Sequence, residues 1–155
     1  MRLSRNYAEI IITSEIEHET VERGLKEGYP DAKIIQQKIN EGLIKVLECK
    51  EKQYLNLGDG EAEVLTETQR EKKKDINAIF ITQDKKAKNK AMLNEIPVQG
   101  GEVCLLESAL QKKISRKFFL RKLSQLGTKF LIPNERIIEI EKYHENKTEV
   151  NNGNN

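Results

Sequence analysis

The chain has 155 residues, of which 37% are hydrophobic and 34% charged, and 27 Lys and Arg against 25 Asp and Glu give a net charge of +2. This length predicts one domain that can bury a core without disulfides or a structural metal. The nearly balanced charge argues against a protein that simply coats nucleic acid. Cys49 and Cys104 form no CxxC pair, so we expect two apolar thiols rather than a zinc site or a disulfide.

The sequence gives no sign of a membrane span or a secretory leader. No apolar run approaches the roughly 20 residues that a transmembrane helix needs, and Met1–Asn6 leads into a charged stretch rather than an apolar signal core. We therefore expect a cytoplasmic protein with no membrane partner. Residues 1–145 are predicted to form the domain, and the polar residues 146–155 a disordered tail.

Short apolar runs alternate with capped, helix-periodic segments along the chain. In chain order, the predicted elements are a strand (8–13), a helix (14–26), a helix from Pro30 that ends at Gly42, a strand (43–47), a helix (59–73), a strand (77–82), a helix (84–94), a very short strand (96–98), a helix (103–112), a helix (116–126) that ends at Gly127, and a helix (134–143). This alternation predicts an α/β protein with a parallel sheet covered on both faces.

Parallel sheets bind ligands at the carboxyl ends of their strands, so acidic residues that follow strands are the first candidates for a site. Glu19, Glu61 and Asp84 lie on three separate segments of this kind. If these segments meet at one edge, their carboxylates suit Mg²⁺ or Mn²⁺, which prefer oxygen ligands and can activate water for attack on phosphate. The alternative for each residue is a solvated side chain or a favourable charge near a helix N-terminus.

Four segments stand out in this order along the chain: Ile10-Ile-Ile-Thr-Ser-Glu-Ile-Glu-His-Glu19, Leu57-Gly-Asp-Gly-Glu-Ala-Glu-Val-Leu65, Ile81-Thr-Gln-Asp-Lys-Lys-Ala-Lys-Asn-Lys-Ala91 and Ile96-Pro-Val-Gln-Gly-Gly-Glu-Val-Cys-Leu-Leu-Glu-Ser-Ala109. They resemble the PIN family of metal-dependent nucleases, in a subgroup related to the toxins of toxin–antitoxin pairs. The resemblance extends over most of residues 5–140. The resemblance implies a three-layer α/β/α sandwich with a central parallel sheet.

The resemblance also implies roles for single residues. Glu19, Glu61 and Asp84 match the family's metal-binding and catalytic carboxylates, which hold Mg²⁺ or Mn²⁺ for the cleavage of single-stranded RNA. Lys85 and Lys88 beside Asp84 are candidates for RNA phosphate contacts. Thr82 is a candidate to hydrogen-bond a carboxylate or a metal-bound water, and so to orient the metal's ligands.

The sequence departs from the family pattern at two places that bear on activity. Gln83 stands where many members have a second Asp. The family's first strand, which ends in an essential Asp and lies at the centre of the sheet, has no counterpart before Ala8. This absence predicts one of three outcomes: a start that lies upstream, a gap filled by another chain, or strands that close up around a site with one ligand fewer.

Three further patterns have simpler interpretations. His18-Glu-Thr-Val-Glu22 is half of a zinc-protease HExxH motif and lacks the second His. Phe118 and Phe119 are expected to lie in the core or at a dimer face rather than to stack on bases. The basic group over residues 112–122 is interpreted as solvated helix surface.

The leading functional hypothesis is therefore a PIN-like endoribonuclease, either active or degenerate, that acts on single-stranded RNA as the toxin of a toxin–antitoxin pair. The expected partners are an antitoxin-like protein and a second copy of the chain in a homodimer. The alternative is a non-catalytic interaction module, or a protein that binds RNA through its lysine clusters without cutting it.

Overall fold

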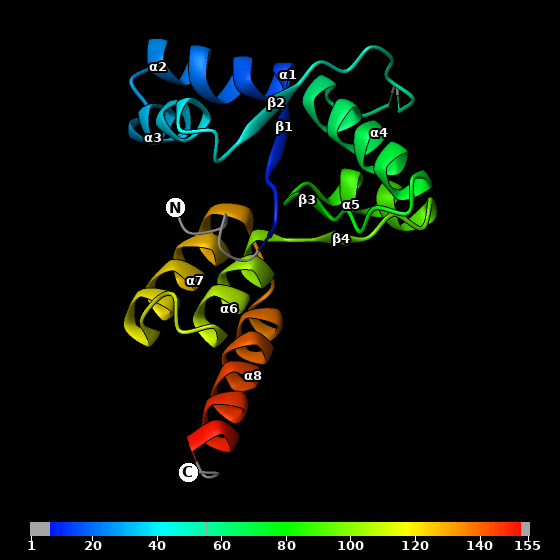
Figure 1. Ribbon diagram of the computed structural model, residues 1–155. Coiled ribbons are helices and arrows are strands. Elements are labelled where there is room, and N and C mark those ends of the chain that lie inside the picture. The colour runs from blue at the N-terminus through cyan, green and yellow to red at the C-terminus, as the bar shows by residue number, and fades with distance from the viewer. Residues whose placement is uncertain (1–6, 55, 153–155) are drawn as a thin grey trace. The chain divides into compact units, whose positions relative to one another are not determined.

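The computed structural model describes residues 7–54 and 56–152 (Figure 1). These residues form two compact units, one over Tyr7–Val98 and one from Gln99 onward, where the sequence predicted a single domain over 1–145. The larger unit contains β1 (Ile11–Thr13), α1 (Ser14–Glu17), the π-helical η2 (His18–Arg23), α2 (Gly24–Lys26), α3 (Pro30–Asn40), β2 (Lys45–Leu47), α4 (Asp59–Lys73), β3 (Phe80–Ile81) and α5 (Lys85–Leu93). The boundary between the units falls within β4 (Val98–Gln99). The smaller unit contains α6 (Gly101–Leu110), α7 (Arg116–Phe130) and α8 (Asn134–Asn152).

The α/β class predicted from the sequence is confirmed. β1 and β2 run parallel, with Ile11 opposite Lys45 and Thr13 opposite Leu47. The strands of the described residues pair two by two, β1 with β2 and β3 with β4, rather than all in one sheet. Because each strand has only two or three residues, the sheets offer few ladder hydrogen bonds, and helix packing joins them: α4 contacts both β1 and β3.

Each unit has its own hydrophobic core. In the larger unit the buried residues come from the loop before α4, from α4, and from the segments up to β4: Tyr54, Ala62, Leu65, Phe80, Ala87, Ala91 and Ile96. In the smaller unit Phe119 and Leu123 of α7 are fully buried and pack with Ala109 of α6 and Ile140 of α8. The core of the larger unit therefore fixes the helices α4 and α5 on which Glu61 and Asp84 were predicted to act.

Four predicted boundaries in the smaller unit differ from the structure. α6 begins at Gly101 rather than at Val103, and it ends at Leu110 rather than at Lys112. α7 continues through Gly127 to Phe130, and α8 continues to Asn152. Residues 146–152, predicted as part of a disordered tail, are therefore helical, and the Thr148 hydroxyl helps to hold this turn by donating to the carbonyl oxygens of His144 (3.0 Å) and Glu145 (2.8 Å). Residues 153–155 of that tail lie outside the described residues.

Of the helices in the described part of the chain, none combines the length and the apolar character that crossing a bilayer requires.

Candidate functional site

Glu19 lies on a π-helical turn between two α-helical turns. The sequence predicted one regular helix over 14–26, and the chain is helical throughout, but residues His18–Arg23 follow the wider π pattern. The Thr20 hydroxyl donates to the Ile16 carbonyl oxygen at 2.6 Å, a side-chain bond that competes with the regular helical ladder. A π turn inserts a residue and changes the direction of nearby side chains, which is why such turns are frequent at functional sites.

Two glycines make room for the carboxylates at the start of α4. A Cβ atom on Gly58 would coincide with the carboxylate of Glu61, which folds back over that glycine. A Cβ atom on Gly60 would overlap Ile16 and lie 3.4 Å from Oε2 of Glu19. The Gly-Asp-Gly-Glu sequence thus lets the helix that carries Glu19 and the N-terminus of α4 approach closely, and it leaves open space where both carboxylates lie.

The electrostatics of Glu19 reflect this crowding of negative charge. Its side chain is exposed, yet partial burial of the carboxylate raises its pKa above the ordinary value, and the negative charges of Glu61, Glu15 and Asp59 raise that pKa further. The positive charge of Arg23 opposes them. Two of the three predicted metal ligands, Glu19 and Glu61, are therefore electrostatic neighbours although they lie on different segments.

Asp84 has a structural role of its own. It is the N-cap of α5, and its Oδ1 accepts the backbone N–H of Ala87 at 2.6 Å. The hydroxyl oxygen of Thr82, predicted to orient a metal ligand, accepts the backbone N–H of Asp84 at 3.1 Å and so shapes the turn into α5. Asp84 is exposed, and it is not among the charges that raise the pKa of Glu19.

The two predicted phosphate-binding lysines follow Asp84 in the first turn of α5. Lys85 is exposed, and Lys88 is partly buried with its Nζ 3.2 Å from Oε1 of Gln83. Gln83, the residue that replaces a second Asp, is therefore a hydrogen-bond acceptor for Lys88.

Glu19 and Glu61 supply the kind of donor that suits one hard divalent cation, because carboxylate oxygens are the ligands that Mg²⁺ and Mn²⁺ prefer. The three negative charges that act on Glu19 outnumber the one positive charge of Arg23, and this excess also favours a cation. However, within residues 7–54 and 56–152 no group of three or more His, Cys, Asp or Glu side chains is placed to hold a metal ion. The structure brings Glu19 and Glu61 together and does not bring Asp84 to them.

No site role was predicted for two further acidic residues near the start of α4, Asp59 and Glu63. Asp59 contributes to the charge around Glu19 and forms an ion pair with Lys52 at 3.0 Å. The same lysine reaches the buried Glu63 at 3.4 Å, and Oε2 of Glu63 has no hydrogen-bond partner. The Gly-Asp-Gly-Glu-Ala-Glu segment could have drawn attention to them, because Asp59, Glu61 and Glu63 all lie near the N-terminus of α4.

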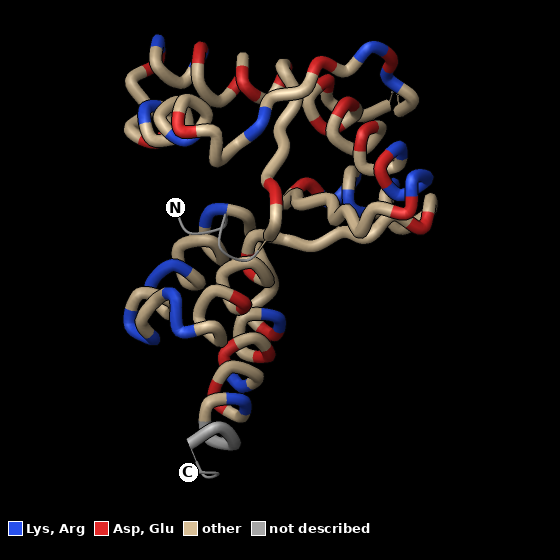
Figure 2. Tube along the Cα trace, viewed as in Figure 1, with Lys and Arg blue, Asp and Glu red and all other residues tan. Residues whose placement is uncertain are grey.

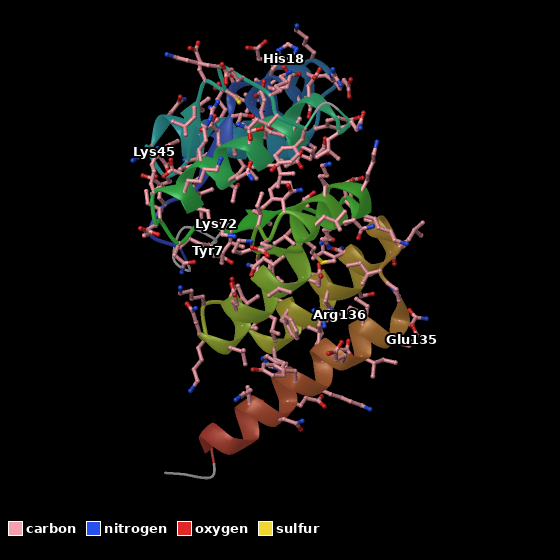
Figure 3. The ribbon with its side chains drawn as sticks, turned by 90° about the vertical axis from the view of Figure 1, so that its right-hand side faces the viewer. Tyr7, His18, Lys45, Lys72, Glu135 and Arg136 are labelled. Carbon is pink, nitrogen blue, oxygen red and sulfur yellow. The ribbon has the colours of Figure 1, made fainter. Side chains whose placement is uncertain are left out.

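His18 lies on an exposed part of the helical segment. Its Nδ1 pairs with Oε2 of the exposed Glu22 at 3.0 Å, one helical turn along the chain. Figure 3 shows His18 at the outer edge of the helices that follow β1. The half HExxH motif is thus an exposed pair on one helix.

Comparison with known proteins gives one match. A family model described as a PIN domain matches residues 1–141 of the chain. No curated protein and no solved structure matches the chain.

Proposed function

The chain belongs to the PIN-domain family, and from that premise we propose that it is a divalent-metal-dependent endoribonuclease that cleaves single-stranded RNA, as the toxin of a toxin–antitoxin pair. The observation that carries the proposal is the approach of Glu19 and Glu61 from separate segments over Gly58 and Gly60. The negative charge of Glu61 helps to raise the pKa of Glu19, and a cation bound by both carboxylates would relieve this repulsion.

In this mechanism the residues of the chain would have three roles: to bind the metal, to bind phosphate and to position the lysines. Glu19 and Glu61 would hold the Mg²⁺ or Mn²⁺ ion, with Asp59 adding negative charge nearby. When bound, the ion supplies an activated water and neutralises charge that develops on the phosphate. Lys85 and Lys88 would bind phosphate oxygens of the RNA. Asp84 and Thr82 would fix the start of α5 and so the position of both lysines.

Cleavage of labelled single-stranded RNA by the full chain in Mn²⁺ tests this proposal. We expect Glu61→Gln and Glu19→Gln each to lower the rate by on the order of 100-fold, since each removes a group that holds the ion at the site of developing charge. Asp84→Ala should also lower cleavage, because it removes the side-chain oxygen that caps α5 and so positions Lys85 and Lys88. Glu22→Gln is the matched control, since Glu22 lies on the same helix as Glu19 and pairs with His18.

Undiminished cleavage in both Glu61→Gln and Asp84→Ala would show that this mechanism is wrong. The expected activity should also disappear in EDTA and return with Mn²⁺.

A second function, a non-catalytic interaction or RNA-binding module, is favoured by one specific observation. The Asp84 carboxylate is engaged in capping α5, and the described residues gather only two of the three predicted ligands. Such a module would pair with an antitoxin-like chain or with a second copy of itself. Calorimetry separates the two functions, because tight Mn²⁺ binding that is lost in Glu19→Gln would count against the module.

A further inference from the structure

α7 carries an unusual concentration of positive charge. The helix Arg116–Phe130 has five basic residues and no acidic one: Arg116, Lys117, Arg121, Lys122 and Lys129. In Figure 2 the blue segments of α7 are not interrupted by red. The net charge of the whole chain is only +2, so this helix holds far more positive charge than its share.

Four of these cations lie on one face of the helix. At 100° per residue, Lys117, Arg121, Lys122 and Lys129 fall within an arc of about 140° and span about 18 Å of the helix axis. The opposite face carries Phe119 and Leu123, which are fully buried against α6 and α8. We call the outward residues Lys117, Phe118, Arg121, Lys122, Gln125 and Lys129 the basic face of α7.

The four cations of the basic face have no carboxylate partner among the described residues. Arg116, at the edge of this surface, pairs with Glu145 of α8 at 2.5 Å. The contacts of Arg121, Lys122 and Lys129 are instead with aromatic rings, and Lys117 is exposed. An uncompensated row of cations on a folded helix attracts a polyanion.

An exposed aromatic ring lies within this row. Phe118 is 37% exposed, whereas its neighbour Phe119 is buried in the core as the sequence predicted. The Arg121 guanidinium carbon lies 5.4 Å from the centroid of the Phe118 ring and the Lys122 Nζ lies 5.8 Å from it. A ring flanked by cations combines the two contacts that single-stranded nucleic acids use, base stacking and phosphate pairing.

Other partners fit this surface less well. A docking helix needs an apolar stripe with anchors at i, i+3, i+4 and i+7, and Phe118 is the single apolar residue of the basic face. Insertion into a membrane surface needs a free apolar face, and that face of α7 is already packed against α6 and α8. The charge and the ring together favour an unpaired strand, whose bases are free to stack.

We propose that the basic face of α7 is a docking surface for single-stranded RNA, in which the four cations bind phosphates and Phe118 stacks on a base. The choice of RNA as the strand rests on the proposed ribonuclease function. The surface itself is separate from Glu19 and Glu61, which lie in the other compact unit.

Fluorescence anisotropy with a labelled RNA of about 15 nucleotides tests the surface, in excess EDTA so that no metal-dependent cleavage occurs. The test variant replaces Lys117, Arg121, Lys122 and Lys129 by Gln. The matched control replaces Lys26, Lys33, Lys50 and Lys73, four exposed lysines of the larger unit, by Gln. Both lower the net charge from +2 to −2, because each removes four positive charges, so only the position of the change differs.

We expect the α7 variant to bind RNA about 100-fold more weakly and to lower the slope of log K against log salt by about 3. The control should change the affinity by less than about threefold. Phe118→Leu should weaken binding about tenfold with an unchanged salt slope, because it removes stacking but no charge.

Three results would overturn the docking surface: equal losses in the two quadruple variants, full affinity in the α7 variant, or tighter binding of an acidic peptide of the same charge. The mutated residues are at the surface, so circular dichroism should show an unchanged fold. A different result would show that the nuclease proposal is wrong and the docking surface is right. RNA would then bind through α7, but Mn²⁺ would produce no cleavage that depends on Glu61.

Discussion

The carboxylate of Glu19 lies in an unfavourable concentration of negative charge. Its carboxylate is held near Glu61, Glu15 and Asp59, and among the charges that act on it only Arg23 is positive. A fold selected for stability alone would not gather like charges at one point, since their repulsion raises the free energy of the folded state. Binding a cation turns this repulsion into attraction, which is the physical link between the charge pattern and the proposed metal seat.

Glu19→Gln should stabilise the protein at neutral pH, by on the order of 1–2 °C in Tm. The raised pKa means that the folded state resists ionisation of this carboxyl. The ionised Glu19 lowers the free energy of unfolding. This loss is absent below the ordinary pKa of about 4.5, and it is complete once the pH has risen through the pKa of Glu19 in the folded state. Thermal unfolding at pH 7.5 and at pH 4 therefore should show the gain at the higher pH alone.

Glu17→Gln, on the preceding turn, controls for the loss of one negative charge from this helix. A Tm gain that is the same at both pH values, or equal in the control, would contradict the electrostatic account. Added Mn²⁺ should raise the Tm of the unmodified chain and should have less effect on Glu19→Gln.

At the scale of elements, the contact between α1 and α4 depends on the missing side chain of Gly60. A Cβ atom there would overlap Cδ1 of Ile16 and lie 3.2 Å from its Cγ1. We expect Gly60→Ala to destabilise the fold by about 1–3 kcal/mol, because overpacking outweighs the small gain in helix propensity. Urea unfolding measures the change.

A second substitution distinguishes overpacking from other effects of the alanine. Ile16→Val removes the Cδ1 atom that the new methyl would meet, so Gly60→Ala should cost much less in an Ile16→Val background. Additive losses in the double variant would show that the two residues do not conflict. Cleavage by Gly60→Ala should fall as well, since the seat of Glu19 and Glu61 depends on the same close approach.

Helix positions in this chain were largely predictable, and the exceptions have physical reasons. The pattern predicted α4 over 59–73 and the start of α7 at Arg116, as observed. Gly127 was expected to end α7, but the helix passes through it, and a Cβ atom there would lie 3.3 Å from Ile137 of α8. The left-handed cap falls instead on Leu131, at φ 49°, a conformation that no local rule assigns to leucine.

The candidate site was predictable in part. The Gly-Asp-Gly-Glu segment and the acidic residue after β1 predicted Glu61 and Glu19, and the structure makes them neighbours. The π turn at Glu19 was not predictable, because residues 14–26 have the pattern of a regular helix and no local rule specifies the wider turn. The cap role of Asp84 was missed because the same spacing suits a metal ligand and an N-cap equally well.

At the scale of the whole molecule, the two compact units carry groups that respond to pH in opposite directions. In the unit of 7–98, the raised pKa of Glu19 weakens the fold as the pH rises. In the unit from Gln99 onward, the buried His144 stacks on Phe119 with 4.7 Å between ring centroids, and its Nδ1 has no hydrogen-bond partner. Burial lowers the pKa of His144, the positive charge of Arg116 lowers it further, and Glu145 opposes both.

Acid should therefore weaken the smaller unit through His144. A histidine whose pKa is lowered in the folded state gives its full stabilisation of the fold above its ordinary pKa of about 6.5. This stabilisation is lost as the pH falls below that value. We expect the Tm of the helical unit to fall by on the order of 3 °C between pH 7.5 and pH 5.5. His144→Leu should remove most of that dependence, because leucine fills a similar space beside Phe119 without a group to protonate. Calorimetric scans of the full chain measure both, and an equal acid response in His144→Leu would assign the effect to another group.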